Sequence, residues 1–241
     1  MYGRDPKTLF AVFANALPGK DDEYNHWCDQ IHIPDAIQGG LFYTCHRYRA
    51  VGAGGLRYMN LWESDRTDLR AGMEQMRPHA EALKAQGRIW PVFEVVWSQV
   101  LTPVAAGEPN PGTVKAVTTV QNDWREPLDG ERFEAWYGTA GLDVAAVAAR
   151  YHSTYRYESY DGSRGRFLSV CESEGPVEAL AGAWAGVAEA GTSPFARYAT
   201  IFEQGHPPEP EEGDPLPGRP GAAWAAHWEP LLQRGTSGRS P

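Results

Sequence analysis

The hydrophobic and polar positions of the first hundred residues predict a strand, a helix, a hairpin, a second helix and a last strand. Residues 9–15 form a short apolar run, which is typical of a buried strand. The segment after it places four apolar residues at the i, i+3, i+4 and i+7 spacing of one helix face, namely Tyr24, Trp27, Cys28 and Ile31. We expect Pro34, and then the Gly39-Gly40 pair, to end this helix.

In the rest of the first half, the hydrophobic pattern changes to the period of two that is typical of strands and then returns to a helical period. Residues 42–50 and 57–63 alternate as the two strands of a hairpin, with a Gly-rich turn at 52–55. A helix over 65–86 and a strand over 92–101 follow. The resulting order, βαββαβ, is that of the ferredoxin-like split βαβ unit.

A shift of 109 residues superimposes the second half of the chain on the first. Trp27 falls on Trp136, since 136 − 27 = 109, and the register runs without a gap from residue 24 to residue 64. We therefore predict two tandem repeats, at 1–102 and 114–205. A linker at 103–113 joins them, and a tail at 206–241 follows the second repeat. The linker and the first part of the tail are rich in Pro, and the tail is also acidic.

Each predicted sheet has helices on one face only, so its other apolar face must be covered. Two fused repeats can cover each other. We expect an α+β fold in which two antiparallel sheets pack into one pseudo-dimeric barrel around a pocket, within a monomer that can still form a homodimer. In the tail, Trp224, His227, Trp228 and Leu231 fall at helical spacing and predict a short amphipathic helix.

The segment 25–35, NHWCDQIHIPD, resembles the Trp-x-x-x-x-His-x-Pro signature of EthD-like proteins. The Gly39-Gly40 pair, the Arg47-Tyr48 pair and residues 58–64 extend the resemblance, which covers 7–102 well and 114–204 weakly. EthD-like proteins belong to the dimeric α/β barrel superfamily. The resemblance implies that fold, a small and mostly apolar substrate, often no cofactor, and a functional role for His32. The superfamily includes cyclases, lactone isomerases, lyases, cofactor-free monooxygenases and some haem proteins.

Histidines distinguish the two repeats. His26, His32 and His46 align with Ala135, Gly141 and Tyr155, so the second repeat has none of the three. A general base needs a pKa near the working pH, which histidine supplies. We place acid–base chemistry in the first repeat, with four candidate catalytic residues: His32, His46, Tyr48 and Tyr58. Each has a structural alternative, which is helix capping for His32 and core packing for the other three.

Aromatic and polar side chains suggest which strand faces line the pocket. We expect Tyr58, Asn60 and Trp62 to face the pocket, with Met59 and Leu61 turned to the helices. In the last strand Phe93, Val95, Trp97 and Gln99 would share the pocket face. The candidate substrate-binding residues are Phe13, Asn15, Trp27, Asn60, Trp62, Trp97 and Tyr155. Asn15 and Asn60 could instead satisfy backbone groups.

Composition narrows the function class. The chain has 241 residues and a net charge of −9, which argues against a nucleic-acid partner. It lacks an apolar run long enough for a membrane span, and its beginning does not resemble a signal peptide. The three cysteines, Cys28, Cys45 and Cys171, form no disulfide framework and suit the cytoplasm.

The known cofactor motifs are absent from the sequence. There is no Cys-x-x-Cys, His-Glu-x-x-His, Walker or Gly-x-Gly-x-x-Gly pattern, so we expect neither a metal nor a nucleotide cofactor. We predict a cofactor-independent enzyme of the cyclase, lyase or isomerase type that acts on a small aromatic or polyketide-like metabolite. Two alternatives stay open: a non-catalytic binding protein for a hydrophobic small molecule, and a haem-binding or monooxygenase-type barrel.

Overall fold

The computed structural model describes residues 6–50, 57–89, 93–106, 114–122, 153–160, 167–178 and 223–235. The chain divides into two units. The N-terminal unit comprises residues 5–49, 56–103 and 230–241, and the C-terminal unit comprises residues 1–4, 50–55 and 104–229. Among the described residues, no helix is long and apolar enough to cross a membrane.

The N-terminal unit contains a four-stranded antiparallel sheet. Its strands are β1 (Thr8–Ala16), β2 (Thr44–Ala50), β3 (Tyr58–Ser64) and β4 (Phe93–Ala106). Strand β1 pairs with β3 and β4, and β3 pairs with β2, so the order is β4-β1-β3-β2. This mixed α+β arrangement with an antiparallel sheet confirms the element order predicted for the first repeat.

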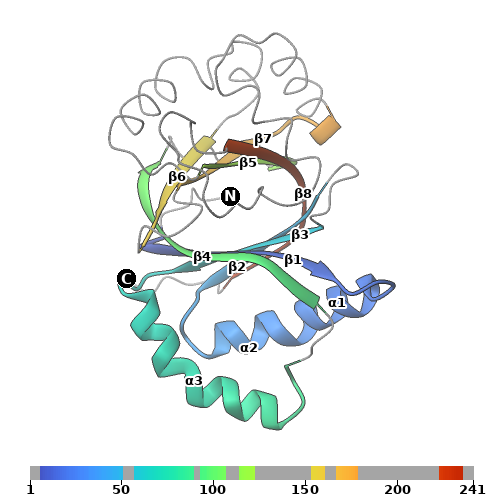
Figure 1. Ribbon diagram of the computed structural model, residues 1–241, viewed down its shortest axis with the longest axis vertical. Helices are drawn as coiled ribbons and strands as arrows, with labels where there is room; N and C mark the ends of the chain where they lie inside the picture. Colours follow the sequence, from blue (N-terminus) through green and yellow to red (C-terminus); the bar gives the residue numbers. More distant parts are fainter. Residues whose placement is uncertain are drawn as a thin grey trace, which may run out of the picture. The chain divides into compact units, whose positions relative to one another are not determined.

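The helices of this unit lie on one face of the sheet (Figure 1). Helix α1 (Asp21–Trp27), π-helix η1 (Cys28–His32) and α2 (Ile33–Gln38) follow one another without a break. The prediction that Pro34 ends the helix is wrong, because Pro34 lies in the first turn of α2, where proline is tolerated. The end at Gly39 is confirmed, since Gly39 is the C-cap.

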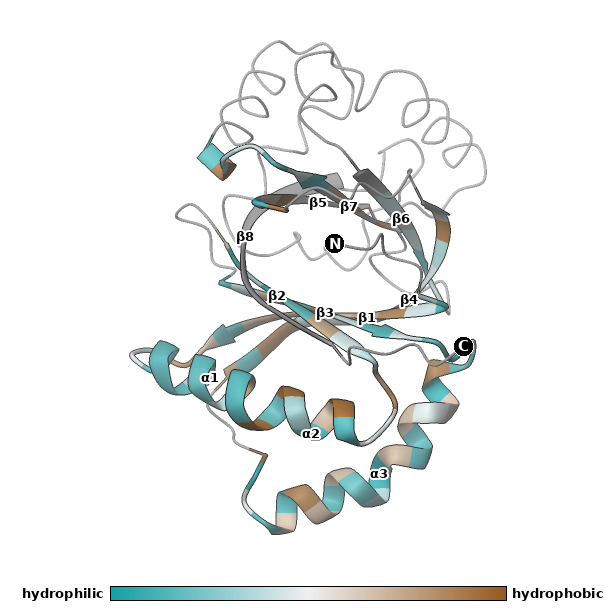
Figure 2. Ribbon diagram, turned by 180° about the vertical axis from the view of Figure 1, so that it is seen from behind, coloured by the Kyte–Doolittle hydropathy of each residue, from teal (hydrophilic) through white to brown (hydrophobic). Residues whose placement is uncertain are grey.

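The last helix of the unit, α3 (Leu69–Ala85), begins at Asp68, whose side chain accepts a hydrogen bond from the backbone N–H of Ala71. Figure 2 shows α1 mainly in hydrophilic colour, whereas α2 and α3 carry hydrophobic segments. Only part of each helix surface therefore belongs to the core.

Strands β1 and β3, at the centre of the N-terminal sheet, are buried on both faces. On β1, Val12, Ala14 and Ala16 pack with the helices around Tyr24 and Trp27. The residues that alternate with them on β1, Leu9, Ala11 and Phe13, are also fully buried. Every position of β3 is buried.

The C-terminal unit has the same strand order. Strand β5 (Ala116–Asn122) pairs antiparallel with β7 (Phe167–Ser173) and β8 (Ala223–Gly235), and β7 pairs with β6 (Ser153–Ser159). The order β8-β5-β7-β6 matches β4-β1-β3-β2. The register also repeats, because the Arg47↔Asn60 pair corresponds to Arg156↔Ser169 at the predicted shift of 109.

One prediction for the tail is wrong, since residues 223–235 form strand β8 and no helix. A short apolar segment can fit both the period of a helix and the period of a strand. Here Trp224, Ala226 and Trp228 lie at alternate positions, so a strand fits this segment as well as a helix does. Pro230 would break a helix, whereas in β8 it follows the last β5 partner, Trp228. The strand and helix expected at residues 198–204 and 133–140 lie outside the described residues.

Candidate functional site

The π-helix η1 explains the spacing of the Trp-x-x-x-x-His motif. Residues five apart in an α-helix lie about 140° apart around the axis, so their side chains cannot stack. In η1 the N–H of Ile33 bonds to the carbonyl of Cys28, which widens the turn to the i→i+5 pattern. The rings of Trp27 and His32 consequently stack, with centroids 4.5 Å apart and planes 11° apart.

His32 is a half-buried imidazole between two indole rings. Its ring also meets Trp62 edge-on, at 5.4 Å and 76°. Within the described part of the chain, no hydrogen bond joins either ring nitrogen to another residue. Burial lowers the pKa of His32 to about 4, with a smaller rise from Asp35 and a smaller fall from Arg47. At pH 7 the imidazole is neutral and can accept a proton.

Trp27 is itself held in place. It is 2% exposed, and its indole Nε1 donates a hydrogen bond of 2.8 Å to the backbone carbonyl of Arg88. Its ring also packs against Phe93, at 5.2 Å and 27°, and against Tyr24, at 6.4 Å and 41°. The ring that supports His32 is therefore fixed by one hydrogen bond and by aromatic packing.

A buried guanidinium connects strand β2 to the helix that carries His32. Arg47 donates to Asp29 of η1, to Asn25 of α1 through Nη2 (2.7 Å), and to Asn60 of β3 through Nε (3.2 Å). Its side chain is fully buried. The guanidinium carbon also lies 5.4 Å from the Tyr24 ring centroid. Arg47 thus fastens the π turn to the sheet.

The tyrosines near this cluster are already hydrogen-bonded. Tyr58 donates to Asp21 (2.8 Å) and accepts from the amide of Asn25 (3.1 Å), and the amide of Asn60 donates to Tyr24 (3.3 Å). Burial, aided by the bond to Asp21, raises the pKa of Tyr58. Tyr58 therefore remains protonated and serves the helix–sheet contact.

The sheet divides the residues predicted as one site into two groups. His32, Trp27, Tyr58, Asn60 and Trp62 lie on the helix side. The prediction that Tyr58, Asn60 and Trp62 point away from the helices is wrong. Asn60 is buried here because it bonds Arg47 and Tyr24, so its polarity reflects a helix–sheet network.

The second group occupies the opposite face of the sheet. It contains His46 and Tyr48, which alternate with Arg47, and the ring pair Phe13–Trp97 at 5.0 Å. His46 Nε2 lies 3.5 Å from a carboxylate oxygen of Glu63; the His46 side chain is mostly buried and that of Glu63 is buried. His32 and His46 are consequently not brought together. Asn15 accepts from the backbone N–H of Arg57, and Tyr155 is buried on β6 of the C-terminal unit.

A β-bulge in β4 corrects another face assignment. Ala14 pairs with Val95 while its neighbour Phe13 pairs with Trp97, so one residue of β4 is extra. Phe93 therefore packs with the helices and Trp97 faces the other way. Strict alternation along 93–99 instead predicts one shared face for Phe93, Val95, Trp97 and Gln99.

Several residues of this cluster are not among the site residues predicted from the sequence: Tyr24, Asn25, Asp29, Asp35, Arg47 and Arg88. Arg47 could have been identified from the sequence, because a charged residue at a core-facing position of a strand needs a buried partner. The partners themselves depend on tertiary contacts over long sequence separations, as in the Asp35–Arg88 pair.

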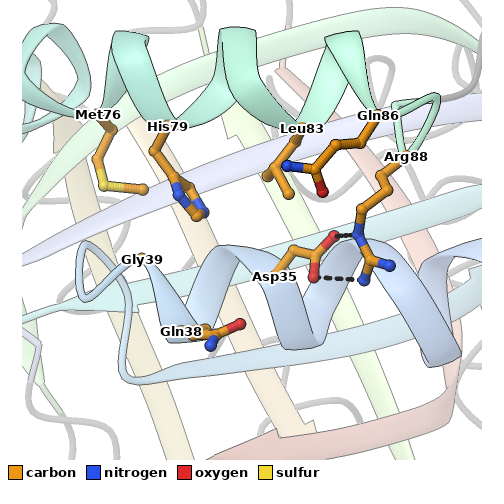
Figure 3. Close-up of a pocket in the computed structure, with 8 residues that line it drawn as sticks. All are labelled: Asp35, Gln38, Gly39, Met76, His79, Leu83, Gln86 and Arg88. Carbon is orange, nitrogen blue, oxygen red and sulfur yellow. Dashed lines mark hydrogen bonds and ion pairs between the residues drawn. The ribbon is translucent and has the colours of Figure 1, made fainter.

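A separate cavity of 570 Å³ lies between α2 and α3 (Figure 3). Its lining consists of Asp35, Gln38, Gly39, Met76, His79, Leu83, Gln86 and Arg88. None of the residues predicted as catalytic or substrate-binding belongs to this lining. In the described part of the chain, no group of three or more His, Cys, Asp or Glu residues could hold a metal ion.

Comparisons with known proteins place the chain at the level of fold. No protein-family model matches it, and no curated protein matches it. An anthrone oxidase-like protein of solved structure is 13% identical, with a TM-score of 0.54 over 100% of this chain and 98% of that one. A proposed chlorite dismutase is 11% identical, with a TM-score of 0.53 over 93% and 94% of the two chains.

A proposed monooxygenase from Fusobacterium nucleatum is 12% identical, with a TM-score of 0.50 over 98% of this chain and 97% of that one. The likeness is one of fold. The mixed α+β architecture with antiparallel sheets fits that of these neighbours. At such low identity the likeness carries no information on the reaction.

Proposed function

We propose that the N-terminal unit binds a small aromatic metabolite beside His32 and uses the imidazole as a proton acceptor, without a cofactor. The observation that carries the proposal is the neutral, half-buried ring of His32 between Trp27 and Trp62, with no hydrogen bond to its nitrogens in the described residues. Aromatic walls with few polar groups are typical of small-molecule sites.

The chemical step is a proton transfer. A C–H bond conjugated with a carbonyl, directly or through an aromatic ring, breaks, the proton moves to a ring nitrogen of His32, and the electron pair is delocalised onto the carbonyl oxygen to form an enolate. Return of the proton elsewhere gives an isomerisation, and internal attack by the enolate gives a cyclisation. Because its pKa is about 4, His32 is a weak base, which favours substrates whose enolate is stabilised by aromatic rings.

Anthrone, an aromatic ketone with an acidic C10–H, provides a direct test. The protein should accelerate exchange of C10–H for deuterium, followed by NMR in D₂O under nitrogen. His32→Ala should lower this acceleration by ~10²–10⁴-fold, the usual contribution of a general base. His26→Ala is the matched control, since it removes another first-repeat histidine from the same helical segment. A loss below about threefold in His32→Ala would remove His32 from the mechanism.

The alternatives have different readouts. A binding protein would retain anthrone with unchanged C10–H exchange. A monooxygenase-type activity would consume oxygen with anthrone, which an oxygen electrode detects. His32 does not fit an axial haem ligand, because metal-bound histidines generally donate their second N–H to a carboxylate or carbonyl, and the described residues supply none. Addition of haem should therefore give no Soret band from His32 ligation.

We also propose that the two units are fused EthD-like repeats whose sheets complete one barrel within the chain. The matching strand orders and the repeated hairpin register support this. Burial of an apolar sheet face contributes roughly 25 cal/mol per Å². Residues 1–104 expressed alone should therefore dimerise or aggregate in analytical ultracentrifugation. A folded monomer at micromolar concentration would contradict the fused-barrel proposal.

A further inference from the structure

Arg88 is held in place by the end of helix α3. The N–H of Arg88 bonds to the carbonyl of Leu83 and the N–H of Gly87 to that of Lys84, both at 2.9 Å. These two bonds form a Schellman motif, and Gly87 has the positive φ of 68° that the motif requires. The backbone at Arg88 is thus set by the helix terminus.

The side chain of Arg88 adds a second attachment. Its Nε and Nη2 donate to the two carboxylate oxygens of Asp35, at 2.8 and 2.7 Å. Figure 3 shows this two-pronged pair spanning from α2 to the segment after α3. Asp35 is 7% exposed, whereas the Arg88 side chain is 41% exposed. A paired fork of this kind fixes both distance and orientation.

The carbonyl of the same residue faces the proposed site. It accepts the hydrogen bond from Trp27 Nε1 at 2.8 Å, and Trp27 stacks on His32. Arg88 therefore joins two elements: α2 through its side chain and the Trp27–His32 stack through its carbonyl. Asp35 also lies three residues after His32 on the same helical segment.

We propose that Asp35 and Arg88 are positioning residues for His32. Their ion pair holds the Arg88 carbonyl at the indole N–H of Trp27, and Trp27 in turn keeps the His32 ring stacked and shielded from water. The catalytic consequence rests on the proposed function of His32. The positioning itself does not, because it concerns the orientation and hydration of two rings.

The Asp35→Ala variant distinguishes a positioning role of Asp35 from a purely electrostatic effect of its carboxylate on His32. The Asp35 carboxylate favours the protonated form of His32, so its removal by itself would lower the pKa of His32. Loss of the clamp has the opposite effect, since water reaching a loosened ring raises the pKa of His32 toward 6.5. The positioning account therefore predicts a rise of about one unit in Asp35→Ala, measured by NMR titration of the His32 ring.

Arg88→Gln and Arg88→Lys complete the series. In Arg88→Gln, exchange of the Trp27 indole N–H with D₂O should accelerate by about tenfold, because local opening becomes more frequent. Arg88→Lys keeps one bond to Asp35 and should restore part of the protection. Arg77→Gln, which removes an exposed pair with Glu74 on α3, is the matched control and should leave both readouts unchanged.

The two readouts have contrasting outcomes. A fall in the His32 pKa in Asp35→Ala, or Trp27 indole exchange in Arg88→Gln equal to that in Arg77→Gln, would overturn the positioning role. If instead His32→Ala leaves anthrone exchange unaltered while these two signals respond as predicted, the proposed function fails and the positioning inference stands. If both hold, Arg88→Gln should also slow anthrone exchange by about tenfold, since small displacements of a catalytic group are costly.

Discussion

The hairpins β2–β3 and β6–β7 have the same register, yet the first carries side chains that the second lacks. Cys45 pairs with Trp62 in the first, and Thr154 with Cys171 in the second. His46 pairs with Leu61 where Tyr155 pairs with Val170. Backbone register is thus shared, and so are the aromatic positions Tyr48/Tyr157 and Tyr58/Phe167, whereas Trp62 and His46 are replaced by Cys171 and Tyr155. The two hairpins thus share strand pairing, while the candidate catalytic histidine His46 lies in one of them only.

The helix that precedes the first hairpin strengthens this contrast. His32 aligns with Gly141 at the shift of 109, and Asn60 with Ser169. The Trp27–His32 stack and the Asn60 bonds to Arg47 and Tyr24 are therefore features of the first repeat. Arg47 itself has an arginine counterpart in the sequence, Arg156, at the same shift of 109.

The largest effect should come from removing the guanidinium that fastens the π turn. Arg47→Leu removes a buried guanidinium and leaves Asn25, Asn60 and the partly exposed Asp29 without this donor, and unsatisfied partners of a buried charged group cost on the order of 3 kcal/mol. Urea unfolding should show a loss of about 3 kcal/mol. Arg57→Leu removes an exposed pair with Asp21 and should cost at most about 1 kcal/mol. Equal losses in the two variants would show that Arg47 has no special role.

A second effect, confined to acidic pH, should appear in the pH dependence of stability. The pKa of His32 is about 4 in the folded chain and about 6.5 when unfolded, so the unfolded state binds more protons between these values. Stability should consequently fall as the pH drops from 6.5 to 4, by up to about 3 kcal/mol from this residue. His32→Phe should flatten the slope of the unfolding free energy in that window. An unchanged slope would show that His32 is not buried as a neutral ring.

The smallest effect should come from the histidine on the opposite face of the sheet. His46→Tyr gives the first hairpin the residue of the second, and His46→Gln is a smaller replacement if tyrosine disturbs packing. Because His46 does not share a face with His32, anthrone exchange should change by less than about threefold, below the effect of a general base. A loss of ~10²-fold in either folded variant would move the chemistry to the His46–Glu63 face.

The element order and repeat register of the hairpins could be predicted from the sequence, because strand alternation and a constant shift are local signals. The asymmetry of histidines was visible for the same reason. Which face of the sheet each side chain occupies could not be predicted. Asn60, a polar residue, was predicted to face the pocket, whereas it forms hydrogen bonds with Arg47 and Tyr24. Period counting also failed at the β4 bulge, where the backbone departs from the regular geometry that such counting assumes, whereas the predicted apolar stripe of Tyr24, Trp27, Cys28 and Ile31 is confirmed in the core.

The central claim is that His32 is a neutral, stacked imidazole at the proposed site. NMR titration of the His32 ring in the intact chain, assigned by comparison with His32→Phe, measures this directly. The account predicts a pKa of about 4 and a ring shielded by Trp27 and Trp62. A pKa near 6.5, the ordinary value of an exposed histidine, would contradict it.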